Sequence, residues 1–133
     1  MGTNVYFYTN NKEIKERYNL TWELTDEPGF GYKAHLGKRS SCWKPLFQKH
    51  NDVINSVIDI LDIYDKEYSS GLKIITEYDK EISRDEFYHD FVLWNKDDKK
   101  ALSHMYCEYD VPIIKEYYFL SNDGFEFCDR EFL

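Results

Sequence analysis

The feature that most constrains the fold is a run of apolar residues spaced as on one side of a helix. Its members recur three and four positions apart: Val53, Ile54, Val57, Ile58, Leu61 and Tyr64, widened by Ile60 and Ile63. Asn51 or Asp52 suits the N-cap, and Gly71 is the type of residue that commonly follows the last turn. We therefore expect an amphipathic helix over about residues 52–68.

A second helix is predicted over about residues 84–95. The segment Ser83-Arg84-Asp85-Glu86 has the pattern of a capping box, in which the serine side chain and the glutamate side chain each bond a free backbone N–H of the first turn. Phe87, Phe91 and Trp94 then follow at helical spacing, so the helix is expected to bury one face.

The remaining apolar residues lie in short segments rich in β-branched and aromatic types, which are typical of strands. These segments cover residues 3–9, 21–25, 31–41, 72–78, 113–120 and 125–128. The turn Ser121–Gly124 predicts a hairpin between the last two. Because strands and helices do not alternate regularly, we expect an α+β fold, a single domain over residues 1–133, with a mainly antiparallel sheet and two helices (about 52–68 and 84–95).

Length and charge restrict the function classes. The chain has 133 residues, enough for one domain, and 18% of them are aromatic, which excludes a disordered chain. It carries 17 Lys and Arg against 25 Asp and Glu, a net charge of −8. A protein that grips duplex nucleic acid through its phosphates usually presents a basic face, so duplex nucleic acid is not expected as a partner.

The cysteines and the N-terminal residues indicate a reduced compartment. Cys42, Cys107 and Cys128 are few, odd in number and far apart, and neither a basic-then-apolar leader nor a membrane-length apolar run is present. We expect a cytoplasmic protein without a membrane partner. His104 and the three cysteines are the available zinc ligands, but buried free thiols are the commoner interpretation, so we expect no metal and no cofactor.

The chemistry-bearing segment is a window without acids. Residues 28–51 contain no Asp or Glu but hold five cations: Lys33, Lys38, Arg39, Lys44 and Lys49. Glycine, hydroxyls, fixed cations and an indole together suit a phosphate-bearing ligand, because cations and hydroxyls bond oxyanions and an aromatic ring can stack on a base. We predict a binding site in segment 33–44, with help from the first strand. Its candidate residues are His35, Lys38, Arg39, Ser40, Ser41, Trp43, Lys44, Asn4 and Tyr6.

Other interpretations of this window stay open. It can be a basic surface strand that balances acidic neighbours, with Trp43 in the core. The acidic, tyrosine-rich remainder can instead dock on a basic host protein and inhibit it. A third alternative is a nucleotide-processing enzyme with His35 as acid or base, although no P-loop and no G-x-S-x-G elbow is present.

Several segments resemble one family of small, largely uncharacterised bacteriophage proteins. Members open M-G-T-N-Y-Y and carry H-I-G-K-S-S-A-G-W. The matching segments here are Met1–Tyr6, His35–Lys38, Ser40–Trp43, Glu77–Ser83, Asp123–Phe125 and Arg130–Phe132. Two departures are the absence of a C-x-x-C ahead of His35, and Arg39 and Cys42 in place of the family's Ser and Gly.

The resemblance implies a bacteriophage accessory protein that acts in the host cytoplasm, in counter-defence or host takeover. It implies no settled activity. We therefore expect a non-enzymatic protein whose partner is a small phosphate-bearing ligand or a host protein, and a homo-oligomer remains open.

Overall fold

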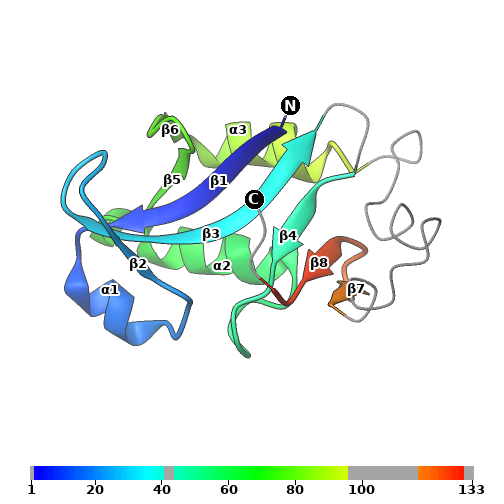
Figure 1. The fold of residues 1–133 in the computed structure, drawn as a ribbon, viewed down its shortest axis with the longest axis horizontal. Coiled ribbons are helices and arrows are strands. Elements are labelled where there is room, and N and C mark those ends of the chain that lie inside the picture. The colour runs from blue at the N-terminus through cyan, green and yellow to red at the C-terminus, as the bar shows by residue number, and fades with distance from the viewer. Residues whose placement is uncertain (1, 41–43, 96–116, 131–133) are drawn as a thin grey trace.

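A computed structural model describes residues 2–40, 44–95 and 117–130 of the chain. One sheet forms the front layer in Figure 1, and the helices α2 (Val57–Glu67) and α3 (Arg84–Phe87) lie behind it. Among the strands in the described ranges, every pair is antiparallel except for one parallel pair. The predicted α+β class with a mainly antiparallel sheet is therefore confirmed.

Within the described residues, the sheet has eight strands. They are β1 (Gly2–Thr9), β2 (Glu23–Thr25), β3 (Gly31–Ser40), β4 (Leu46–Gln48), β5 (Lys73–Thr76), β6 (Glu81–Ile82), β7 (Tyr118–Leu120) and β8 (Glu126–Cys128). Their order is β6-β5-β1-β3-β4-β8-β7, and β2 pairs with the start of β3. The predicted hairpin is the β7–β8 pair. The residues 113–116 of the predicted strand 113–120 lie outside the described ranges.

The helix α2 begins later than predicted. Its N-cap is Ser56, whose hydroxyl accepts the N–H of Asp59, rather than Asn51 or Asp52. The preceding residues form a tight turn instead, in which the N–H of Val53 donates to the carbonyl of His50 and Asn51 takes a positive φ of 48°. The apolar spacing continued through this turn, so periodicity alone placed the start five residues too early.

The other helical segments are short. They are α1 (Lys12–Arg17), η1 (Tyr68–Ser70), which Gly71 ends with φ 107°, and η2 (Tyr88–Val92), a π-helical turn that continues α3. The capping box at Ser83 and Glu86 is confirmed, since both of its hydrogen bonds form. None of the helices in the described ranges is long and apolar enough to cross a membrane.

The core lies between the sheet and the helices. Val5, Phe7 and Phe47 of the strands belong to one hydrophobic cluster with Ile60 of α2 and Phe87 of α3, and all five are fully buried. Burial of apolar surface stabilises the folded state by about 25 cal/mol per Å² removed from water. This core layer therefore contributes strongly to the free energy of unfolding.

A buried carboxylate ties α1 to α2. Glu67 is 2% exposed and accepts hydrogen bonds from Arg17 Nη1 at 2.6 Å and from Tyr18 Oη at 2.7 Å. Burial acts to raise the pKa of Glu67, but the bonds from Tyr18 and Arg17 outweigh it and hold the pKa below its usual value. Burial and the bond to Glu67 raise the pKa of Tyr18 to about 12.

Gly37 allows β3 and β4 to approach closely. A Cβ at this position would lie 2.7 Å from the backbone oxygen of Leu46 and 3.0 Å from Phe47 Cδ1. We expect Gly37→Ala to lower the free energy of unfolding by about 1–3 kcal/mol, the usual cost of overpacking.

Gly29→Ala is the matched control, measured beside it by urea denaturation. Its Cβ would meet only Tyr8 Oη, at an ordinary 3.4 Å. Equal stability of the two variants would show that the β3–β4 contact does not depend on glycine.

Candidate functional site

Strand pairing gathers five of the predicted site residues on one face of the sheet, including Ser40, which pairs with Gly2. Tyr6 pairs with His35 and Asn4 pairs with Lys38, and paired residues of antiparallel strands point to the same side. Lys33 lies on this side too, two positions before His35. This side of the sheet faces away from the core. We call it the polar sheet face, and its residues are Asn4, Tyr6, Lys33, His35, Lys38 and Ser40.

The floor of the polar sheet face is a buried hydrogen-bonded group. Asn4, His35 and Gln48 are all buried. His35 Nε2 lies 2.8 Å from Asn4 Oδ1, and His35 Nδ1 lies 3.4 Å from Gln48 Oε1.

His35 is neutral at pH 7. Burial lowers its pKa to about 4, and the charges of His50 and Lys38 act in the same direction, against the hydrogen bond with Gln48. A neutral imidazole carries one N–H, so one ring nitrogen donates and the other does not; the Nε2 contact is with Asn4 Oδ1 and the Nδ1 contact is with Gln48 Oε1. His35 is therefore held as an orienting group, with its ring 5.3 Å from that of Tyr6.

His50 fixes the backbone below His35. Its Nε2–H donates to the carbonyl oxygen of His35 at 2.5 Å, and its Nδ1 accepts the N–H of Thr21 at 3.0 Å. Because Nε2 faces a carbonyl oxygen and Nδ1 faces an N–H, His50 must be the neutral tautomer with its proton on Nε2. Burial lowers the pKa of His50, outweighing the bond to His35. His50 was not among the residues predicted to take part in the site.

Lys38 and Ser40 meet above a residue without a side chain. A Cβ on Gly2 would lie 2.4 Å from Lys38 Cε and 2.8 Å from Ser40 Oγ. The ammonium-bearing stem and the hydroxyl therefore share the space over Gly2, at one end of the polar sheet face. Lys33 lies farther along the face, with its Nζ 4.8 Å from the centre of the Tyr6 ring.

Arg39 points to the other side of the sheet. Its guanidinium lies 4.6 Å from the Trp94 ring and 5.8 Å from the Phe91 ring, and it donates to the carbonyl oxygen of Asp90 at 3.4 Å. Trp94 Nε1 donates in turn to the backbone oxygen of Ser40 at 3.1 Å. Arg39 and Lys38 therefore lie on opposite faces of the sheet. The contacts of Arg39 with Asp90, Phe91 and Trp94 connect β3 to η2 and the residues after it.

The other predicted ligand-binding residues contribute less. Lys44 is half-buried two positions before β4, and Ser41 and Trp43 lie outside the described residues. Of the zinc candidates, only Cys128 is described, as a buried free thiol whose pKa burial raises. Over residues 2–40, 44–95 and 117–130, no three His, Cys, Asp or Glu side chains are grouped to hold a metal ion.

Two acids near the polar sheet face were missed in the sequence analysis. Glu77 Oε1 accepts the N–H of Asn4 at 2.9 Å, and Glu23 pairs with Lys33 across β2 and β3. Burial raises the pKa of Tyr6, and the charges of Glu77 and Glu23 raise it further. Glu126 is a third acid on this side, in the row of the sheet that holds Leu46 and Lys38. Carboxylates therefore lie along the whole face, and the Lys38–Ser40 end is the part where an ammonium-bearing side chain and a hydroxyl converge.

No protein-family model, curated protein or solved structure matches this chain. The interpretation of the site therefore depends on its own geometry. An ammonium, a hydroxyl and an aromatic ring along one strand pair can bind an oxyanion at one end and a planar group at the other.

Proposed function

We propose that the protein binds a small phosphate-bearing ligand, nucleotide-like in chemistry, on the polar sheet face, without converting it. The observation that carries this proposal is the convergence of Lys38 and Ser40 over Gly2. Lysine supplies the charge, and the serine hydroxyl donates a hydrogen bond to a phosphate oxygen.

Tyr6 is the stacking surface for a base. It lies two strand positions, about 7 Å, from Asn4, which is the residue paired with Lys38. The Lys33 ammonium covers this ring and has to move aside, at a cost of about 0.5–1 kcal/mol for an exposed cation–π contact. Stacking of a base on the Tyr6 ring contributes about 1–3 kcal/mol, which exceeds the cost of displacing Lys33.

We place this binding activity in a bacteriophage accessory protein that sequesters a host nucleotide signal in the cytoplasm. The family resemblance motivates that setting, and the neutral, nearly buried His35 favours binding over proton transfer. A basic partner protein is the second candidate, because a separate acidic cavity favours it.

Thermal-shift and calorimetric titrations with mono- and dinucleotides, and with inorganic phosphate and sulfate for comparison, test the proposal. We expect Lys38→Ala to weaken nucleotide binding at least tenfold, about 1.4 kcal/mol. Lys12→Ala is the matched control, because Lys12 is exposed on α1. Gly2→Ala should also weaken binding, since the added methyl displaces the Lys38 stem.

Two results would contradict the proposal. One is that no nucleotide or phosphate stabilises the folded protein. The other is that Lys38→Ala and Lys12→Ala weaken binding equally. Analysis of the bound ligand after incubation shows whether it has been converted, which would replace binding by catalysis.

A further inference from the structure

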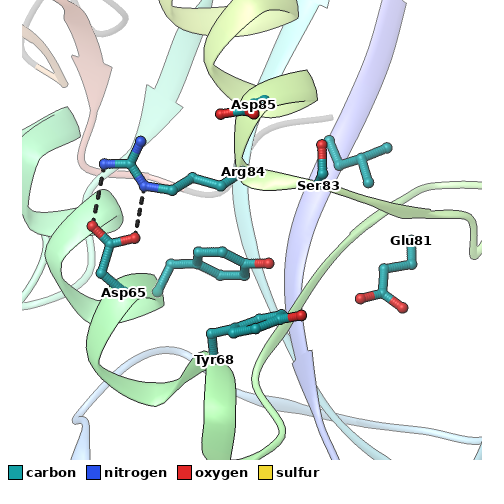
Figure 2. Close-up of a pocket in the computed structure, with 8 residues that line it drawn as sticks. Asp65, Tyr68, Glu81, Ser83, Arg84 and Asp85 are labelled. Carbon is teal, nitrogen blue, oxygen red and sulfur yellow. Dashed lines mark hydrogen bonds and ion pairs between the residues drawn. The ribbon is translucent and has the colours of Figure 1, made fainter.

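A cavity of about 540 Å³ lies away from the polar sheet face, where the end of α2 and η1 face β6 and the start of α3. Figure 2 shows that Tyr68 projects toward the side where Glu81 lies, while the guanidinium of Arg84 is turned back to Asp65. The walls therefore combine aromatic rings with carboxylates.

Among the described residues that line the cavity, the guanidinium of Arg84 is paired with a carboxylate. Arg84 Nε donates to Asp65 Oδ1 at 2.6 Å, and Arg84 Nη2 donates to Asp65 Oδ2 at 3.2 Å. Such a two-bond pair is geometrically specific and leaves no cation to receive an anionic ligand. Asp85 and Glu81 add two more carboxylates to the wall. The ammonium of Lys73 lies 3.9 Å from Glu81 Oε1, in a half-exposed pair that water screens.

The aromatic part of the wall is a pair of tyrosines. Their ring centres are 5.5 Å apart, Tyr64 is buried and Tyr68 is 59% exposed. Burial raises the pKa of Tyr64, and the charges of Tyr68, Glu81 and Asp65 raise it further. The negative potential of the carboxylates therefore extends to the rings.

We propose that this cavity receives an arginine side chain presented by a basic partner protein. Ring faces attract a guanidinium through their quadrupole, and carboxylates bond it at its edge, so the two kinds of wall complement the two surfaces of one side chain. The net charge of −8 adds long-range attraction for a basic partner. This site is separate from the polar sheet face, and either can be correct without the other.

Fluorescence anisotropy of a labelled Arg-Gly repeat peptide at 50 mM and 150 mM salt tests the site. We expect the double variant Glu81→Gln with Asp85→Asn to weaken binding about tenfold at both salt concentrations. The matched control, Asp26→Asn with Asp52→Asn, makes the same charge change at exposed positions and should change affinity less than twofold at 150 mM salt.

Two variants of Tyr68 test the contribution of its ring. Because Tyr68 is exposed, we expect both variants to fold. Tyr68→Phe keeps the ring and should bind the peptide as the unaltered protein does, whereas Tyr68→Ala should bind several-fold more weakly. Three results would overturn the proposal: no binding of the peptide, an equal loss in the acidic double variant and its control, or saturable binding of spermine without binding of the peptide. The last would assign the cavity to a free polyamine.

Discussion

Acidification from pH 7 to pH 4 is expected to lower the free energy of unfolding by about 3 kcal/mol through His35 alone. Its pKa is about 4 in the folded chain and 6.5 in the unfolded chain, and each pKa unit corresponds to about 1.4 kcal/mol. The structural reason is that His35 is 8% exposed and held neutral between Asn4 and Gln48.

The direction follows from which state binds protons first. As the pH falls below 6.5, the unfolded histidine becomes protonated while the folded one stays neutral, so protons favour unfolding. The contribution of His35 is complete above pH 6.5 and is lost as the pH falls to about 4. His50, whose folded pKa is also lowered, acts in the same direction.

Urea denaturation at intervals of half a pH unit measures this effect. The range from pH 6.5 to pH 5 isolates the histidines, because the carboxylate of Glu67, with a pKa below its usual 4.5, begins to titrate only at lower pH. His35→Gln is the control and should remove part of the slope. Equal free energies of unfolding at pH 7 and pH 5 would show that His35 and His50 are not held neutral in the fold.

Phe47→Ala is expected to lower the free energy of unfolding by about 3–5 kcal/mol, the usual cost of removing a buried phenylalanine. The Phe47 ring is fully buried and lies 5.6 Å from the Phe127 ring, 5.7 Å from that of Phe125 and 6.4 Å from that of Phe87. Its removal leaves a cavity between β4, β8 and α3.

Phe30→Ala is the control for this change, since Phe30 is 70% exposed. It should alter the free energy of unfolding by about 0.5 kcal/mol or less. Urea denaturation midpoints, with equal slopes for all three proteins, give the comparison. A loss below about 1 kcal/mol in Phe47→Ala would contradict the central position of this ring.

The sequence predicted the fold well where local chemistry decides it. The strand 3–9, the capping box at Ser83 and the hairpin after Leu120 depend on neighbouring residues, and each is present. The other features of the fold depend on pairing between strands that are far apart in the sequence or too short to recognise. The parallel pairing of β4 with β8 and the two-residue strand β6 have no local signal.

The candidate site was predicted as a segment, but strand geometry divides a segment between two faces. Alternation alone separates Lys38 from Arg39, so that division was available from the sequence. The irregularity of the β1–β3 register between Val5 and Tyr6 was not available, although it sets which residues of β3 share a face with Asn4. The contact of Arg39 with Trp94 joins elements 55 positions apart and needed the structure.

The pairing of β4 with β8 also determines how late in protein synthesis the sheet can be completed. Leu46 pairs with Glu126, eighty positions later along the chain. A ribosome-bound chain that already contains β1, β3 and β4 therefore keeps one edge of β4 without its strand partner until residues 126–128 emerge. Such an edge can pair with another nascent chain. Slow synthesis after β4 has emerged from the ribosome would prolong this exposure and lower the yield of native protein.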